Sequence, residues 1–180
     1  MRRSIILLIM FILLAGCGSK GYRDAKIDQS KGETLLELDV NKDGKVDCLW
    51  AQDLRDPNNP ITLWRKDDLN FDGKFDVEQQ YKFGKISLEK LDLDFDGSFD
   101  VINHYENGIL SVSEYSLKTP GKTDMWVYYD KGNIVKKEVD TKGTGKPDYF
   151  EFYKDSKIDR VGRDMDGDGI IDKWEQKKGP

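Results

Sequence analysis

A short unit recurs along this chain, and it constrains the fold more than any other feature. Each copy carries a glycine at the same place. These glycines are Gly44, Gly73, Gly97, Gly121, Gly145 and Gly169. After a first step of 29 residues, every later step is 24 residues, and around four of the glycines the sequence reads D-x-[DN]-x-D-G-x-x-D. A fixed short period is typical of a repeat array in which each copy forms one supersecondary unit.

The intervals between the acidic segments have the pattern of a β-hairpin. Each full interval has a tyrosine, then a short turn, then an aliphatic residue, as in Tyr105, Asn107-Gly108 and Leu110. Asn-Gly between such runs is a strong hairpin signal. The flanking runs, such as MWVYY at 125–129, are rich in β-branched and aromatic residues. Each unit therefore predicts a strand, a tight turn, a strand and an acidic loop.

The repeat predicts an all-β fold, an antiparallel meander of tandem hairpins joined by acidic loops. About five hairpins give roughly ten strands, in a sheet that is either open or curled. Alternation places Trp126, Tyr128, Phe150 and Phe152 on one face, so we expect a thin core with aromatic ladders. Residues 56–60, which include two prolines, predict a longer loop within the first hairpin.

The acidic segments have the ligand spacing of a calcium loop. Calcium takes six to eight oxygens, and such a loop supplies side chains at positions 1, 3 and 5, a backbone carbonyl at position 7 and a ligand at position 9. Glycine at position 6 permits the sharp turn. The predicted ligands are Asp39, Asn41, Asp43, Lys45 and Asp47; Asp68, Asn70, Asp72, Lys74 and Asp76; Asp92, Asp94, Asp96, Ser98 and Asp100; and Asp164, Asp166, Asp168, Ile170 and Asp172. The alternative is a set of Asp/Asn/Gly turns that only solvate the surface.

These segments resemble EF-hand loops over their first nine residues, whereas the flanking helices of that family are absent from the sequence. In the last copy Glu175 stands at position 12, where the EF-hand pattern has its bidentate glutamate. The resemblance therefore implies Ca²⁺ as the ligand but not the EF-hand fold. We expect residues 174–178 to form one short terminal turn at most.

Two copies have lost most of their acidic residues. The fourth has Ser116, Lys118 and Pro120 at positions 1, 3 and 5, and the fifth has Lys142 and Thr144 at positions 3 and 5. One hypothesis is that the lysine ammonium replaces the ion, pairing with Asp124 in the fourth copy and with Asp140 and Asp148 in the fifth. The other is simple loss of the site. Four bound ions per chain are predicted.

The N-terminus is a separate kind of segment. Two arginines precede an apolar run at 4–14 that is too short to span a bilayer, which is typical of a signal peptide. Leu14-Ala15-Gly16-Cys17 resembles the lipobox of bacterial lipoproteins, which implies a signal peptide at 1–16, palmitate-type acylation of Cys17 and anchoring in a membrane. The alternative is an uncleaved or ordinary signal peptide with an incidental cysteine. Residues 17–33 are expected to be the lipidated cysteine and a tether, and residues 34–180 the repeat domain.

Gly18 and Ser19 after the lipobox favour the outer membrane, by resemblance to Gram-negative lipoproteins. In overall pattern the chain resembles uncharacterised bacterial lipoproteins built from tandem Asp-rich repeats. Once Cys17 carries lipid, Cys48 has no disulfide partner, and a buried small side chain is expected there, with a reactive thiol as the alternative.

A net charge of −5 and the lack of a basic patch argue against a nucleic-acid partner. No enzymatic constellation is evident: His104 is the single histidine, and Glu89, Glu106, Glu114 and Glu138 are unassigned carboxylates. Two functions remain. One is a calcium-stabilised binding module that touches a protein or glycan with its aromatic sheet face; the other is a structural envelope lipoprotein in which calcium only stabilises the fold.

Overall fold

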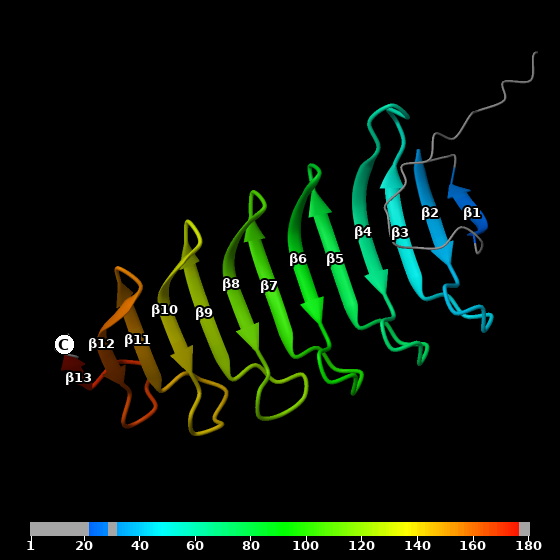
Figure 1. The fold of residues 1–180 in the computed structure, drawn as a ribbon. Coiled ribbons are helices and arrows are strands. Elements are labelled where there is room, and N and C mark those ends of the chain that lie inside the picture. Colours follow the sequence, from blue (N-terminus) through cyan, green and yellow to red (C-terminus); the bar gives the residue numbers. More distant parts are fainter. Residues whose placement is uncertain (1–21, 29–31, 177–180) are drawn as a thin grey trace, which may run out of the picture.

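The protein is described here from a computed structural model, which covers residues 22–28 and 32–176 (Figure 1). The predicted signal peptide at 1–16, Cys17, and residues 18–21 and 29–31 of the predicted tether lie outside the described residues, as do residues 177–180.

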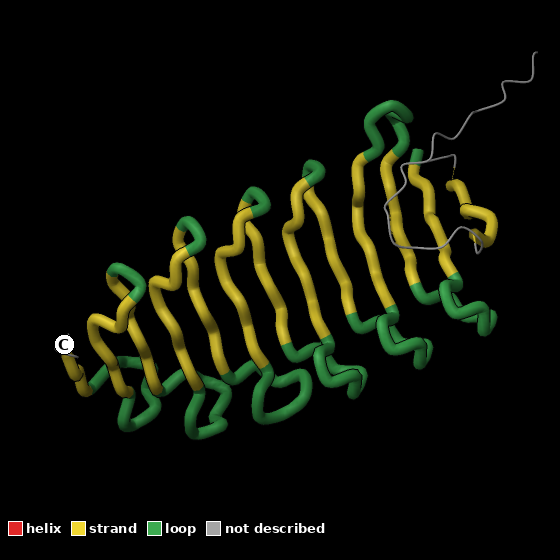
Figure 2. The backbone as a smooth tube through the Cα atoms, in the orientation of Figure 1, coloured by secondary structure: helices red, strands yellow, loops and turns green. Residues whose placement is uncertain are grey.

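The described residues form one antiparallel sheet of thirteen strands, which lie side by side in the order of the sequence. The strands are β1 (Tyr22–Asp28), β2 (Glu33–Leu38), β3 (Cys48–Asp53), β4 (Ile61–Asp67), β5 (Val77–Lys82), β6 (Lys85–Leu91), β7 (Val101–Glu106), β8 (Ile109–Tyr115), β9 (Met125–Asp130), β10 (Asn133–Val139), β11 (Tyr149–Lys154), β12 (Lys157–Arg163) and β13 (Lys173–Gln176). The all-β meander is confirmed, and of the two predicted forms the sheet takes the open one, because β1 pairs only with β2 and β13 only with β12. Figure 2 shows this single layer of strands and loops.

Three strands lie beyond the ten that the sequence predicts. β1 and β2 precede the first predicted hairpin, and β1 lies within the segment assigned to the tether. β13 forms where a short terminal turn was expected, and its Glu175 pairs with Val161 of β12. The physical reason is the open edge: without these strands the outer N–H and C=O groups of β3 and β12 would have no strand partner.

The tight turns follow the prediction. In the β7–β8 turn, Asn107 and Gly108 have φ of 54° and 84°. Positive φ at both central residues defines a type I′ turn, whose twist suits a two-residue hairpin. The pairs at 83–84, 131–132 and 155–156 share this conformation. The first hairpin instead has the longer loop at 54–60, as expected.

The core is thin because both faces of the sheet lack a second layer among the described residues. Only six apolar residues are buried there: Cys48, Ala51, Val101, Val127, Phe150 and Val161. Basic side chains cover several aromatic rings instead. The Lys136 ammonium lies 4.0 Å from the centre of the Tyr128 ring, and the Arg160 guanidinium lies 5.0 Å from the rings of both Phe152 and Trp174. The aliphatic stems of these side chains shield apolar surface from water.

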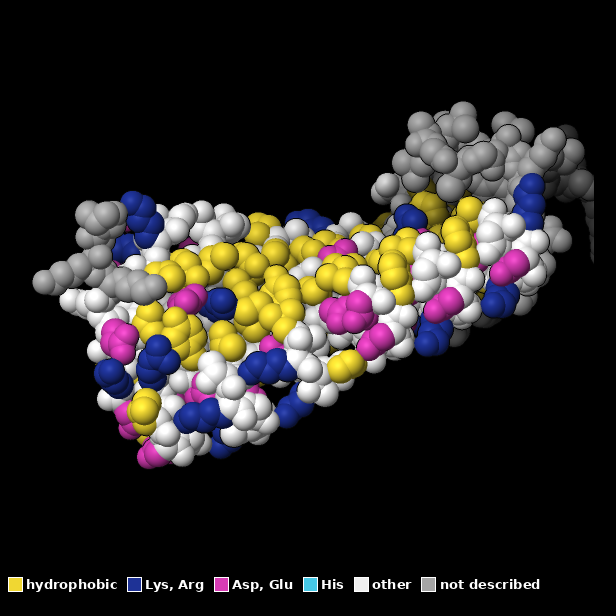
Figure 3. Space-filling model, turned by 60° about the horizontal axis from the view of Figure 1, so that its bottom comes forward, with side chains coloured by type: hydrophobic (Ala, Val, Ile, Leu, Met, Phe, Trp, Pro, Cys, Tyr) yellow, Lys and Arg dark blue, Asp and Glu magenta, His cyan; other side chains and the backbone are white. Residues whose placement is uncertain are grey.

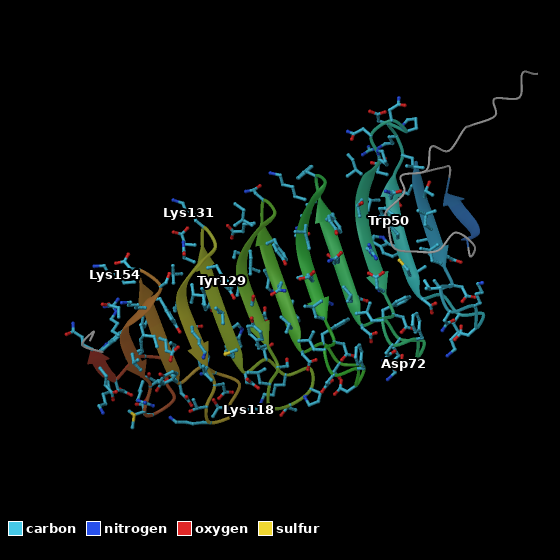
Figure 4. The ribbon with its side chains drawn as sticks, viewed as in Figure 1. Trp50, Asp72, Lys118, Tyr129, Lys131 and Lys154 are labelled. Atoms are coloured by element: carbon cyan, nitrogen blue, oxygen red, sulfur yellow. The ribbon has the colours of Figure 1, made fainter. Side chains whose placement is uncertain are left out.

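The ends of the strands form two long edges, which differ in chemistry. All six acidic loops lie along one edge and the hairpin turns lie along the other (Figure 1). In Figure 4, Asp72 and Lys118 lie at the first edge, whereas Lys131 and Lys154 lie at the second. We refer to the first as the loop edge and to the second as the turn edge.

Candidate metal sites along the loop edge

Six loops of nine residues make up the loop edge. We number them loop 1 (39–47), loop 2 (68–76), loop 3 (92–100), loop 4 (116–124), loop 5 (140–148) and loop 6 (164–172). Their bases are joined by backbone hydrogen bonds. In each of loops 2 to 6 the N–H at position 1 donates to the carbonyl at position 9 of the preceding loop, over 2.7–3.0 Å. The sheet ladder thus continues into the loops and holds neighbouring sites side by side.

The carboxylate at position 9 fixes the start of every loop. It accepts the backbone N–H of position 2 in all six, over distances of 2.6 to 3.1 Å. Asp76 shows how enclosed this group is, since only 1% of its surface is exposed. Buried backbone N–H groups need an acceptor, and here the acceptor is a charged one.

The carboxylate at position 1 fixes the middle of the loop. It accepts the N–H of the position-6 glycine in loops 1, 2, 3, 5 and 6, at 2.6 to 3.0 Å. Loop 4 has Ser116 at this position. Positions 1 and 9 together form a frame that curls the backbone around its own carboxylates, and the glycine has the positive φ that this curl requires, for example 93° at Gly97.

Two of the loops bring three carboxylates to one point. Ligand oxygens of Asp92, Asp94 and Asp100 all lie within 4.8 Å of one another in loop 3, and those of Asp164, Asp166 and Asp172 do so in loop 6. Both groups consist of positions 1, 3 and 9. These six predicted ligands are therefore positioned to hold a metal ion. Loops 1 and 2 have an asparagine oxygen, from Asn41 and Asn70, at the corresponding position 3.

Some of the predicted ligand residues have a buried carboxylate oxygen that accepts no hydrogen bond from the described part of the chain. Oδ1 of Asp92 and Oδ1 of Asp47 have no hydrogen-bond partner among the described residues, although the Asp92 side chain belongs to the loop 3 triad and the residue is only 4% exposed. An unpaired buried charge is costly unless a cation or hydrogen-bond donor meets it.

The other predicted ligands take different places. The position-5 carboxylates of Asp43, Asp72, Asp96 and Asp168 accept the backbone N–H of position 7, at 2.7 to 2.8 Å, and are outside the triads. The N–H groups at position 7 belong to Lys45, Lys74, Ser98 and Ile170, whose carbonyls were the predicted ligands.

Glu175 is not part of the loop 6 triad. It lies on β13, and its Oε1 is 3.0 Å from the Lys173 ammonium and 3.8 Å from the Arg163 guanidinium. The strand that forms here directs the position-12 carboxylate into ion pairs on the sheet, which argues against its role as a bidentate ligand.

One hypothesis was that the lysines of loops 4 and 5 pair with carboxylates of their own loop. In the structure their ammonium groups bond to the next loop instead. The Lys118 ammonium donates to the carbonyls of Asp140 and Thr141, and the Lys142 ammonium donates to those of Asp164 and Met165, at 3.1 and 3.0 Å. Each lysine therefore reaches positions 1 and 2 of the next loop. The side chain is long enough to cross the strand pair, and the carbonyls there offer several acceptors, whereas Asp124 and Asp148 are already bonded to backbone N–H groups.

Lysines also connect the acidic loops, which sequence reasoning missed. The Lys45 ammonium donates to the Asp72 carbonyl at 3.3 Å. Lys74 lies so close to Gly97 that a side-chain carbon on this glycine would be 2.7 Å from its Nζ. The available signal was the recurrence of lysine at positions 3 and 7, but spacing within one loop does not show a contact with the next.

The backbone groups of the loops also shift carboxylate pKa values. The N–H of Gly167 is the largest cause of a lowered pKa at Asp164, to which Gly169 and Lys142 add. Burial raises the pKa of Asp140, but the N–H groups of Gly143, Thr144 and Gly145, with the charge of Lys118, outweigh burial and the net pKa is lowered. The loop backbone thus favours the ionised carboxylate at Asp140 and at Asp164.

Four of the five residues considered for catalysis form hydrogen bonds on the sheet, whereas Glu106 is exposed at the end of β7. His104 Nε2 is 2.7 Å from Glu114, whose other oxygen accepts the Thr123 hydroxyl. Glu138 accepts the Tyr128 hydroxyl at 2.8 Å, and Glu89 accepts an amide N–H from Gln79 at 2.8 Å. These bonds account for the carboxylates as parts of cross-strand networks.

No protein-family model matches this chain, and no curated protein matches it closely enough to count as a relative. Among residues 22–28 and 32–176, no helix has the length and apolarity needed to cross a bilayer.

Proposed function

We propose that this protein is a calcium-binding lipoprotein of the cell envelope, held on the outer membrane by acylated Cys17, with a non-enzymatic repeat domain that Ca²⁺ stabilises. The carboxylate triads of loops 3 and 6 are the observation that carries the calcium assignment. Three carboxylates that lie within 4.8 Å of one another repel unless a cation joins them. Hard carboxylate oxygens on a flexible loop are the ligands that calcium prefers.

The buried Oδ1 of Asp92 gives independent support. A divalent cation at the triad would supply the partner that this oxygen lacks within the described chain. The same frame occurs in loops 1 and 2, so the proposal extends to four loops, while the lysines of loops 4 and 5 occupy the place of an acidic ligand. The position-7 carbonyls and water would complete the shell.

The affinity should be modest, because such extracytoplasmic modules with few bidentate ligands bind calcium at about 10⁻⁴–10⁻³ M. At tenfold excess over the dissociation constant each site contributes about 1.4 kcal/mol of stability. Four sites would then rival the stability of a small domain.

Calorimetry of the purified chain with Ca²⁺ tests the proposal, and melting with and without EDTA is its companion. We expect four ions per chain and a melting temperature that falls markedly in EDTA. Six ions would show that the lysine loops also bind. No uptake together with an unchanged melting temperature would overturn the calcium assignment.

The open faces bear on the alternative role as a purely structural lipoprotein. Neither face is covered by a second layer among the described residues, which favours display over a closed scaffold. A protein or glycan partner at the aromatic face remains a prediction. The cations that already cover Tyr128, Phe152 and Trp174 leave less free ring surface for such a partner.

A further inference from the structure

Apolar side chains are exposed along the loop edge at a fixed position. Position 2 of five loops has a large aliphatic side chain, with between 49 and 64% of each residue exposed: Val40, Leu69, Leu93, Leu117 and Met165. Loop 5 has Thr141 there. Eight of the fourteen exposed large hydrophobic residues in the described chain lie in these loops. Figure 3, with the loop edge turned forward, shows apolar atoms beside acidic and basic ones.

Two phenylalanines add to this row in a strained conformation. Phe71 and Phe95 occupy position 4 of loops 2 and 3 with φ of 66° and 64°, and they are 42 and 43% exposed. A bulky residue is disfavoured in the left-handed region, whereas Gly143 and Gly167 adopt it at the same position without strain. Neither burial nor backbone geometry explains an aromatic residue there, and strain of this kind accumulates at functional sites.

The exposed side chains alternate with the carboxylate sites. The N–H of Leu93 donates to Asp100 at 2.6 Å, so the apolar residue is fixed directly beside the loop 3 triad. Without an ion this edge repels anions. The six loops hold 17 aspartates and seven lysines, so four bound calcium ions change the net charge of the edge from −10 to −2. Each ion also keeps coordination positions that phosphate oxygens can fill. Lys45 and Lys74 supply further positive charge along the same edge.

We infer that the calcium-loaded loop edge docks on a membrane surface of anionic lipid headgroups, with position-2 aliphatics and the two phenylalanines entering the interface. This inference rests on the proposed calcium binding. The shape of the surface favours a bilayer over a protein. The apolar tips form a single row at intervals of two strands, about 9.5 Å, rather than one packed patch. Interfacial binding combines dispersed apolar area with attraction to anionic headgroups, and that attraction would come here from the bound ions that contact phosphate oxygens rather than from the net charge of the edge.

A fluorescent probe on each edge tests the contact in the full chain. The environment-sensitive dye NBD would be attached through Leu69→Cys on the loop edge or through Ile109→Cys on the turn edge, two residues that are both 56% exposed. Cys17→Ser removes one of the two native cysteines. Cys48 is buried, and burial raises its thiol pKa to about 12, so it does not compete for the dye. A local probe is informative whether or not the N-terminus inserts.

With vesicles of phosphatidylglycerol and phosphatidylcholine, the Leu69→Cys probe should shift to shorter wavelength in Ca²⁺ and return in EDTA. Vesicles of phosphatidylcholine alone should give no shift, and neither should the Ile109→Cys probe. Adding Leu93→Ser and Leu117→Ser should raise the lipid needed for half of the shift about twentyfold, since a half-buried leucine contributes roughly fivefold each. The matched pair Phe83→Ser and Ile134→Ser, at the turn edge, should leave it unchanged.

The outcomes separate the two proposals. Calcium uptake by calorimetry with no lipid-dependent shift overturns the docking surface and leaves calcium binding intact. A shift in Ca²⁺ without vesicles, accompanied by increased light scattering, identifies a second copy of the chain as the occupant and also overturns it. Equal shifts at both edges would show non-specific adsorption. No calcium uptake removes the proposed function itself.

Discussion

Loop 3 and loop 5 have the same backbone hydrogen bonds but differ in the charge of their side chains. In both, the position-1 carboxylate accepts the glycine N–H, at 2.7 Å from Gly97 to Asp92 and at 2.6 Å from Gly145 to Asp140. In both, the position-9 carboxylate accepts the N–H of position 2. They diverge at positions 3 and 5, where loop 3 has Asp94 and Asp96 and loop 5 has Lys142 and Thr144.

The difference separates two roles for acidic residues. The carboxylates at positions 1 and 9 hold the loop conformation through backbone N–H groups, and this role persists in loop 5, where the other acids are gone. The carboxylate at position 3 completes a triad in loop 3, whereas in loop 5 the lysine binds carbonyls of the next loop. A permanent ammonium thus joins loops 5 and 6, while loop 3 is arranged for an exchangeable ion.

The largest effect should come from the frame, and it should be the same in both kinds of loop. Asp76→Ala in loop 2 and Asp124→Ala in loop 4 each remove the acceptor of two backbone N–H groups. Each unsatisfied buried group costs about 1–3 kcal/mol, so each variant should lose about 3 kcal/mol. Urea unfolding in EDTA, followed by circular dichroism, measures this.

Asp159→Ala is the matched control, because Asp159 is exposed on β12 and a surface change there should stay within about 0.5 kcal/mol. If Asp124→Ala behaved like this control, the position-9 carboxylate would not hold the loop 4 backbone, and the comparison between the two kinds of loop would fail.

A charge exchange tests the second role. Asp94→Lys gives loop 3 the position-3 residue of loop 5, so calorimetry should count one calcium ion fewer. In tenfold calcium excess the variant should lose about 1.4 kcal/mol relative to wild type, and in EDTA the difference should nearly vanish. Asp130→Lys, at the turn edge, makes the same charge change and should retain every ion. A full complement of ions in Asp94→Lys would show that the triad is not a ligand set.

The lysine contacts should contribute less to stability than the frame does. The contribution of Lys142 in loop 5 should be present without calcium. Lys142→Met keeps the stem but loses the two bonds to the Asp164 and Met165 carbonyls. We expect a loss of about 1 kcal/mol in EDTA by urea unfolding. Lys131→Met removes an equally charged group from an exposed turn and should change little. Equal stability of the two variants would mean that the ammonium does not join the loops.

Much of the fold is predictable from the sequence because its signals are local and repeated. Asn107-Gly108 specifies a type I′ turn through the backbone alone, and the structure has it. The period then orders the hairpins. β1, β2 and β13 escaped prediction because they lie outside the hairpins between the six loops. Their strand conformation comes from the open edges of neighbouring strands, a tertiary effect.

The candidate site was predictable as far as local spacing in the sequence determines it. Spacing identified positions 1, 3 and 9, which the structure brings together in loops 3 and 6. It could not show that Asp96 turns to the N–H of Ser98, or that Glu175 enters ion pairs on β13. The reach of Lys118 into loop 5 was also invisible, because an inter-loop contact depends on the lateral packing of repeats rather than on order within one.

The smallest expected effect concerns acid, and it uses Asp140 because loop 5 lacks the acidic ligands at positions 3 and 5. Its folded-state pKa is lowered: burial opposes ionisation, but three backbone N–H groups and Lys118 outweigh it. A lowered pKa contributes stability above the unfolded value, about 3.9, and this contribution is lost as pH falls through the folded value. In EDTA the urea midpoint should be flat from about pH 7 to 5 and fall below about pH 4. Asp140→Asn should have a lower urea midpoint at pH 7. Its stability should also fall less steeply in acid, because the variant takes up about one proton fewer on unfolding.

The exposed Asp155→Asn is the control, and its acid slope should follow that of wild type. An identical acid slope in Asp140→Asn would mean that no ionised carboxylate holds loop 5. The backbone conformation shared by loops 3 and 5 would then not depend on the charge at position 1.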